Sequence, residues 1–199
     1  QSLEETKAKL IELPPAKKKR FVEQYELNND DVEILVSDKN LADYTEKVFS
    51  ELCAWIEANG DSWERQKKKL AKTAANWLIH ELFKHLNIDN KTIKDINITP
   101  ENFAELIALV YQNKINSSAA QQILEVMYKH GGDPSNIMEE MGLAQIDNIE
   151  ELENEIKKII TDNPDQASQF KSGKTALLQF FIGKTMAATG GKANPKIVT

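Results

Sequence analysis

Lysines and glycines gather near the C-terminal end of the chain, where their chemistry suits contact with phosphate groups. Three lysines flank a turn of small and polar residues: Lys184, Lys192 and Lys196 around Gly190, Gly191, Asn194 and Pro195. Exposed glycines let another backbone approach closely, and neighbouring ammonium groups neutralise phosphates. The pattern predicts a surface for RNA or for an acidic protein, with contacts from Lys174, Lys184, Lys192, Asn194 and Lys196.

A second basic surface is predicted between Asp61 and about Leu86, on a long amphipathic helix. Residues 62–72 hold five basic residues and one acid, a net charge of +4. Leu70 on the apolar side and Lys72 on the basic side point about 200° apart, at about 100° per residue. The basic side can therefore face a partner, and its candidate contacts are Arg65, Lys69 and Lys72.

Groups suited to catalysis or metal binding are hard to find in this sequence. Cys53 lies in an apolar helical stretch, where a buried structural thiol is expected. His80 and His85 are five residues apart, whereas side chains on one helix face stand about three or four residues apart. We therefore predict no catalytic residue and no metal ligand.

Two stretches end like a phosphate-binding loop, Gly173-Lys174-Thr175 and Gly183-Lys184-Thr185. Such a loop also needs an earlier glycine, but Ser168 and Leu178 occupy the required positions. Both stretches also fall in a helical context with no strand before them, which argues against a nucleotide site.

The composition is that of a soluble helical chain with one or two domains. It has 199 residues, of which 41% are hydrophobic and 28% are charged. A single cysteine suits a reducing cytosol, and no apolar run approaches the roughly 20 residues of a membrane helix. The chain begins without Met, so we expect it to be cut from a longer protein.

The net charge of −6 argues weakly against nucleic acid as a partner, but the charges are segregated along the chain. Residues 133–163 carry a net charge of −7, whereas residues 164–199 carry +4. This segregation can present a basic face on an acidic protein.

Start and stop signals predict an all-α fold of two small helical domains with no significant sheet. A first short helix would begin at the Ser2–Glu5 capping box and stop before Pro14. Longer helices are predicted over 16–26, 41–58, 61–86, 100–113, 118–131 and 173–188. Asp61, Thr99 and Ser118 are the predicted caps of three of them. Shorter helices are predicted to begin at Asn28, Asp133, Asn148 and Asn163. Residues 87–98 are predicted to form an irregular loop.

Several stretches, in order along nearly the whole chain, resemble the B subunit of a bacterial-type tRNA-dependent amidotransferase (GatB). The N-terminal ones are Leu13-Pro14-Pro15-Ala16 with Arg20-Phe21, then Ser37-Asp38-Lys39-Asn40-Leu41-Ala42-Asp43-Tyr44. The central ones are Ala75-Asn76-Trp77-Leu78 with Glu81-Leu82, then Lys114-Ile115 with Ser118-Ala119-Ala120. The last ones are similar to a closing signature shared with YqeY-like proteins: Lys171-Ser172-Gly173-Lys174, Gly183-Lys184-Thr185-Met186 and Gly191-Lys192-Ala193-Asn194-Pro195.

The resemblance implies a role in translation, in the bacterial cytoplasm, without DNA or membrane binding. The full enzyme would convert Glu-tRNA(Gln) and Asp-tRNA(Asn) to the amides with ATP, Mg²⁺ and ammonia from glutamine, together with A and C subunits. Residues 1–15 would end a linker from a catalytic domain that this chain lacks. Residues 16–131 would form a helical domain and 132–199 a YqeY-like tail. Both would bind tRNA(Gln) or tRNA(Asn), with no cofactor in the chain itself.

The sequence departs from the family pattern at three places. Glu26-Leu27 stands where Gly-Leu is usual, Thr45 replaces a usual Phe, and Thr189-Gly190-Gly191 varies a turn where a basic residue is common. These departures predict a less sharp helix end, a looser core and one weaker phosphate contact.

Two other functions stay open beside the tRNA-binding one. The chain could be a stand-alone YqeY-like protein, although the entry stretch at Leu13–Ala16 favours the amidotransferase family. It could also be a scaffold that docks onto other subunits without touching RNA. Salt dependence separates the scaffold, because phosphate contacts weaken steeply as salt rises.

Overall fold

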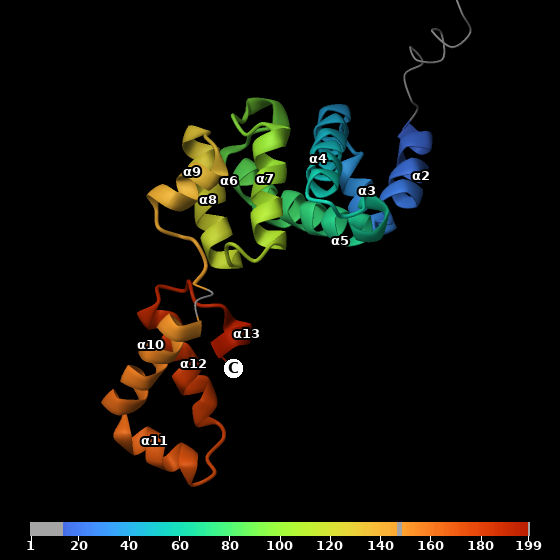
Figure 1. The fold of residues 1–199 in the computed structure, drawn as a ribbon. Helices are drawn as coiled ribbons and strands as arrows, with labels where there is room; N and C mark the ends of the chain where they lie inside the picture. Colours follow the sequence, from blue (N-terminus) through green and yellow to red (C-terminus); the bar gives the residue numbers. More distant parts are fainter. Residues whose placement is uncertain (1–13, 147–148, 199) are drawn as a thin grey trace, which may run out of the picture. The chain divides into compact units, whose positions relative to one another are not determined.

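The computed structural model describes residues 14–146 and 149–198, and within these ranges the chain is all-α, as predicted (Figure 1). No β-strand occurs in these ranges, and a single parallel bridge pairs Ile146 with Ala193. The chain divides into two compact units, residues 1–107 and 108–199. The proposed division into a linker, a helical domain and a tail at residues 15 and 131 stays a prediction.

The helices follow one another with short connections. In the first unit they are α2 (Pro14–Tyr25), α3 (Asn29–Leu35), α4 (Lys39–Ala58), α5 (Trp63–Asn76), the π-helix η1 (Trp77–Leu82), α6 (Phe83–Asp89) and the 3-10 turn η2 (Ile93–Asp95), and α7 (Pro100–Tyr111) begins there. In the second unit they are α8 (Ser117–His130), α9 (Pro134–Glu140), α10 (Ile149–Asp162), α11 (Pro164–Lys171), α12 (Leu177–Ala188) and α13 (Pro195–Val198).

The core of the first unit is built on α4, which packs against α5. Leu52 and Leu70 are fully buried there, and Thr45 is buried with its hydroxyl donating to the Leu41 carbonyl at 2.8 Å. Phe49 of α4 also meets Tyr25 of α2, with ring centroids 4.5 Å apart. Apolar burial of this kind is the main force that holds such helices together.

Several predicted helix ends are confirmed. Asn28 and Asp133 each accept a hydrogen bond from a backbone N–H three residues further on, at 2.8 and 2.9 Å. Thr99 accepts one from Asn102 at 3.1 Å. Gly131 ends α8 with a φ of +72°, a conformation that glycine adopts without strain.

Other predicted helix ends were wrong, each for a local reason. The helix α4 begins at Lys39, two residues before the predicted start at Leu41, because Asp38 caps it. Ser62 rather than Asp61 is the N-cap of α5, and Asn116 rather than Ser118 caps α8. The predicted helix from Ser2 and the predicted cap at Asn148 lie outside the described residues.

The last long helix begins at Leu177, later than the predicted start at Gly173. Gly173 has a φ of +103°, which no α-helix contains, so the chain must turn before α12 can begin. After α12 the chain forms the short helix α13, which was not predicted from the sequence.

The helix predicted over 61–86 is interrupted by the π-helix η1. Its apolar residues recur every four positions: Leu70, Ala74, Leu78, Leu82 and Leu86 are all buried. An α-helix turns about 400° in four residues, so such a row drifts by about 40° per step. The wider turn of a π-helix offsets part of this drift and keeps the row on the core side.

Residues 87–98 are less irregular than predicted. The helix α6 continues to Asp89, and Asn90 ends it with a φ of +52°. Thr92 and Asp95 then form a reciprocal cap around η2, in which the Thr92 N–H donates to the Asp95 carboxylate at 2.8 Å.

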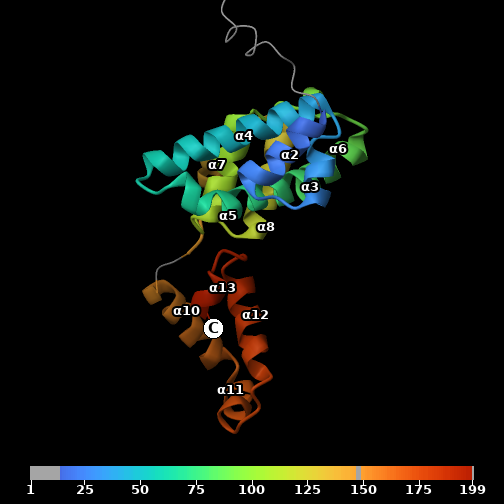
Figure 2. The same ribbon diagram turned by 90° about the vertical axis from the view of Figure 1, so that its right-hand side faces the viewer.

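The second unit buries fewer side chains in its C-terminal helices. The helix α10 packs against α12 (Figure 2), but only Leu152 and Ile159 of α10 and Thr185 of α12 are buried among their described residues. The helix α11 buries none of its described residues. The large apolar residues of α12 are half-buried, and its last two alanines are exposed.

Candidate nucleic-acid interface

The turn that follows α12 is held by backbone hydrogen bonds. The Gly190 N–H donates to the Ala187 carbonyl at 3.1 Å, and the Gly191 N–H donates to the Met186 carbonyl at 2.6 Å. Both glycines have positive φ, +61° and +77°. Residues with a side chain are strained in this conformation, which explains the glycine pair.

Two segments from earlier in the second unit anchor the same turn. The Ile146 N–H donates to the Lys192 carbonyl at 2.8 Å. The Asn116 side-chain amide, at the start of α8, donates to the Gly191 carbonyl. The backbone around Lys192 is therefore positioned by the start of α8 and by the connection between α9 and α10.

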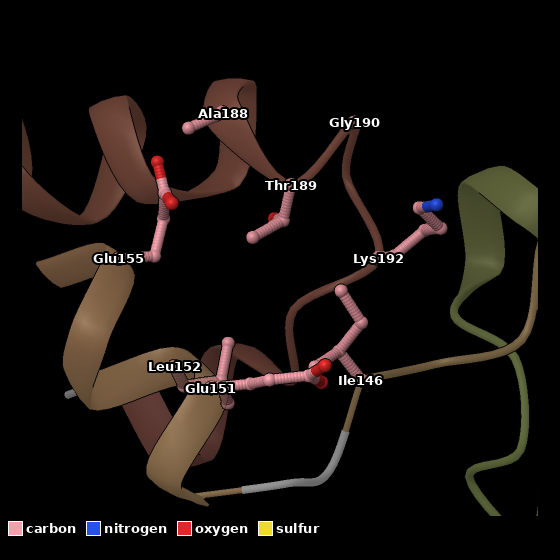
Figure 3. Close-up of a pocket in the computed structure, with 8 residues that line it drawn as sticks. All are labelled: Ile146, Glu151, Leu152, Glu155, Ala188, Thr189, Gly190 and Lys192. Atoms are coloured by element: carbon pink, nitrogen blue, oxygen red, sulfur yellow. The ribbon is translucent and has the colours of Figure 1, made fainter.

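A hollow of about 540 Å³ lies beside this turn (Figure 3). It is lined by Ile146, Glu151, Leu152, Glu155, Ala188, Thr189, Gly190 and Lys192, and we call it the tail hollow. Figure 3 shows α10 with its two glutamates along one side, and the end of α12 with the turn along the other.

Thr189 joins α12 to the turn. Its hydroxyl donates to the Thr185 carbonyl at 2.8 Å and accepts from the Ala193 N–H at 3.3 Å. This side chain therefore has a structural part in the turn at the position where a basic residue was expected. The loss of a phosphate contact there stays a prediction.

The predicted contact residues of the C-terminal segment do not all lie together. Lys192 lines the tail hollow, and the Asn194 carbonyl accepts from the Ile197 N–H at 2.9 Å at the start of α13. Lys174 lies beyond the other end of α12, a helix of about 18 Å, and its ammonium donates to the Gln169 side chain at 2.9 Å. The side chain of Lys196 lies outside the described ones.

Lys184 is exposed on α12, between these two ends. Its ammonium lies 5.6 Å from the centroid of the Phe180 ring, a cation–π distance. Phe180 is half-buried, in agreement with a packing role for the ring. The exposed ammonium remains able to meet an anion.

The second predicted surface lies on α5 in the first unit. Arg65, Lys69 and Lys72 are exposed on one face, at positions that repeat with the helical period. Arg65 forms an ion pair with Asp61 at 2.9 Å. An exposed pair of this kind is weak, so the guanidinium can exchange the carboxylate for a phosphate.

Sequence reasoning missed the carboxylates of the tail hollow, Glu151 and Glu155. They are four residues apart on α10, so they share one helix face. That spacing is visible in the sequence. The residues that face the two glutamates are not visible in the sequence, because Thr189 and Lys192 lie more than 30 positions further along the chain.

The described residues contain no group of three or more His, Cys, Asp or Glu side chains arranged to hold a metal ion. Cys53 is half-buried rather than buried. Burial, followed by the nearby Glu57 carboxylate, raises the pKa of its thiol, which disfavours the nucleophilic thiolate. Among the helices described, none is both long and apolar enough to cross a membrane.

Comparison with known proteins finds a family match and several relatives. The model of the GatB domain family matches residues 61–199. The B subunit of the aspartyl/glutamyl-tRNA(Asn/Gln) amidotransferase from Zymomonas mobilis subsp. mobilis is 38% identical over 199 residues, which is 98% of this chain and 38% of the relative.

B subunits of the same name from two other bacteria are similar over the same share of this chain, 98%. The one from Rickettsia africae is 35% identical over 196 residues, and the one from Clostridium novyi is 37% identical over 196 residues. The chain spans only 37% and 38% of the length of these relatives.

Proposed function

The chain belongs to the GatB domain family, and on this basis we propose that it is the tRNA-holding C-terminal part of a tRNA-dependent amidotransferase B subunit. The full enzyme converts Glu-tRNA(Gln) to Gln-tRNA(Gln) and Asp-tRNA(Asn) to Asn-tRNA(Asn) in the bacterial cytoplasm. Its A and C subunits are the protein partners. We assign no catalytic residue to this chain, and we place the use of ATP and Mg²⁺ in the rest of the enzyme.

The observation that carries the tRNA-binding part of the proposal is the turn beside the tail hollow. It combines two glycines of positive φ with Lys192 at the edge of a concave surface. Glycines permit a close approach of another backbone, and a lysine beside them offers a charge to a phosphate. Phosphate contacts of this kind position an RNA without reading its sequence.

The test is binding of labelled tRNA(Gln) to the chain at several salt concentrations, beside the triple variant Lys184→Ala/Lys192→Ala/Lys196→Ala. We expect affinity to fall steeply with salt, and the triple variant to bind more weakly with a salt slope lower by roughly one for each lost phosphate contact. A matched control, Lys19→Ala/Lys84→Ala/Lys129→Ala, removes the same charge from other helices. It should change the slope much less.

Equal losses in both triple variants would show a general charge effect and would contradict the proposed surface. Absence of tRNA binding at low salt, with circular dichroism showing an intact helical fold, would contradict tRNA holding by this chain. Salt-insensitive binding to the A and C subunits would then favour the scaffold.

A further inference from the structure

We propose that the tail hollow reads one unpaired base of the bound RNA, and that Glu151 and Glu155 select a base whose edge presents N–H donors, guanine above all. This inference rests on the proposed tRNA-binding function and adds a specificity element to it. It concerns residues that a phosphate-binding surface would not need.

The two carboxylates are available to a ligand. Neither forms an ion pair with another residue in the described part of the chain, whereas Glu153 on the next face of α10 pairs with Lys157 at 3.3 Å. Glu155 is half-buried against the hollow, and Glu151 is exposed at its edge (Figure 3). Both line the hollow from α10, with Glu155 extending toward Ala188 and Glu151 toward Ile146, so each can meet a ligand at a different end of the hollow.

The sign of their charge indicates what they contact. Carboxylates repel phosphates, so on an RNA-binding surface they weaken backbone contacts. Carboxylates do, however, accept hydrogen bonds from base edges, and unpaired RNA bases expose these edges to proteins. Guanine presents two adjacent N–H donors to one carboxylate, whereas the single N–H of uracil lies between two carbonyl oxygens that a carboxylate repels.

The rest of the hollow suits a nucleotide. Its volume of about 540 Å³ lies in the range of small-molecule sites. The half-buried Ile146 and the exposed Ala188 give it apolar surface for the face of a base. Lys192 stands on the opposite side with its side chain extending away from the two glutamates, so its ammonium can meet a phosphate that lies outside the hollow.

The turn leaves room for the sugar and phosphate. A methyl group added at Gly190 would meet one atom within 4 Å, the Lys192 Cε at 3.9 Å. The backbone on this side of the hollow is therefore open to another molecule, while its own hydrogen bonds to α12 keep its position. The hollow thus combines base acceptors, an apolar wall and a cation in one place.

The test is nuclear magnetic resonance titration of the ¹⁵N-labelled chain with guanosine 5′-monophosphate and with uridine 5′-monophosphate. We expect both to shift the amide signals of Thr189, Gly190 and Lys192, with the guanosine nucleotide binding about tenfold more tightly, as a good base contact allows. Glu151→Gln/Glu155→Gln should abolish this preference, and Lys192→Ala should weaken both nucleotides alike. Glu140→Gln/Glu153→Gln removes the same charge outside the hollow and should keep the preference.

The outcomes separate this inference from the proposed function. If tRNA binds with a steep salt slope but the two nucleotides bind equally, or shift signals elsewhere, base reading is wrong and tRNA holding stands. If the guanosine nucleotide is preferred while tRNA does not bind, the hollow is a nucleotide site and tRNA holding is wrong. A preference that survives in Glu151→Gln/Glu155→Gln overturns the role of these carboxylates.

Discussion

Glu26 occupies a backbone conformation that suits glycine. It follows α2 with a φ of +54°, and its carboxylate lies 3.6 Å from the Lys68 ammonium. The helix α2 still ends sharply at Tyr25, contrary to the prediction of a less sharp end. The turn is kept, and a residue with a side chain is strained in this left-handed conformation. The exposed ion pair returns little of this cost.

We expect Glu26→Gly to raise the free energy of unfolding by about 0.5–1 kcal/mol, because glycine relieves the left-handed strain but adds entropy to the unfolded chain. Urea denaturation at neutral pH measures the change. Lys68→Ala breaks the same ion pair without touching the backbone and should change stability by less than about 0.5 kcal/mol. A loss of stability in Glu26→Gly would show that the left-handed residue is not strained.

Asp43 links α2 and α4 through charge. It accepts a hydrogen bond from the Lys17 ammonium at 2.7 Å, and hydrogen bonds from Lys17 and then Lys39 lower the pKa of its carboxyl below the ordinary value. A carboxyl with a lowered folded-state pKa stabilises the fold above the unfolded pKa, about 3.9. That contribution is lost as pH falls through the lower, folded value.

Asp43→Asn should therefore be less stable than the parent chain near neutral pH, with a gap that narrows as pH falls below about 4. Urea midpoints measured across this range give the comparison. Asp162→Asn removes an exposed carboxylate elsewhere and should show a smaller change with pH. A gap of constant size for Asp43→Asn would mean that the Lys17 contact does not stabilise the fold through charge.

The start of the helix α8 has two residues that could cap it. Both Asn116 and Ser118 are residues that favour caps. Asn116 takes the role: its carbonyl oxygen accepts from the Ala119 N–H at 2.9 Å, while its amide donates to the Gly191 carbonyl. One side chain therefore caps a helix and anchors the turn of the tail hollow.

Asn116→Ala should destabilise the chain by about 1 kcal/mol or more, since it loses a cap and a tertiary hydrogen bond. Ser118→Ala should cost less than about 0.5 kcal/mol. Asn116→Asp keeps the cap acceptor and loses the donor to Gly191, so it separates the two contributions. Thermal denaturation of the three variants is the measurement, and equal losses for Asn116→Ala and Ser118→Ala would contradict the assigned cap.

The π-helix η1 interrupts the helix that was predicted over 61–86. The row of buried residues at four-residue spacing, Leu70 to Leu86, was readable in the sequence as a row that one α-helix cannot keep on one side. The helix predicted over 61–86 has the α-helical period throughout and does not include the wider turn over Trp77–Leu82. Such turns are frequent at functional sites, although no site residue is assigned to this one.

Across the whole molecule, the helices differ in how much they bury. Eight residues of α4 are buried, whereas α11 buries none and α12 buries only Thr185 among their described residues. Segments with few buried contacts open at lower free energy than the core. Ligand-binding segments commonly belong to this less stable part.

Hydrogen–deuterium exchange should therefore be slower in α4 than in α11 and α12, by at least about tenfold, because the C-terminal helices open without unfolding the core. Mass spectrometry of the exchanged chain resolves these helices. The well-buried helix α8 serves as an internal control and should exchange like α4. Equal protection of α12 and α4 would show that the chain unfolds as one cooperative unit.

The all-α class and many helix ends could be predicted from the amino-acid sequence alone, because these features depend on interactions within one turn. Thr99 and Asp133 cap the starts of their helices and Gly131 ends α8, as predicted, since the hydrogen-bond partner of each lies within about four residues. The family was also readable from ordered motifs along the chain. Local signals of this kind need no knowledge of what packs against the helix.

Contacts between distant segments settled what these local signals left open. Asn116 rather than Ser118 caps α8, and its side-chain amide also donates to the carbonyl of Gly191, a residue 75 positions away. The tail hollow exists because α10 lies beside α12 and places Glu151 and Glu155 across from Lys192. No spacing in the sequence encodes such a meeting, because it depends on packing between helices and on a turn held by hydrogen bonds from distant segments.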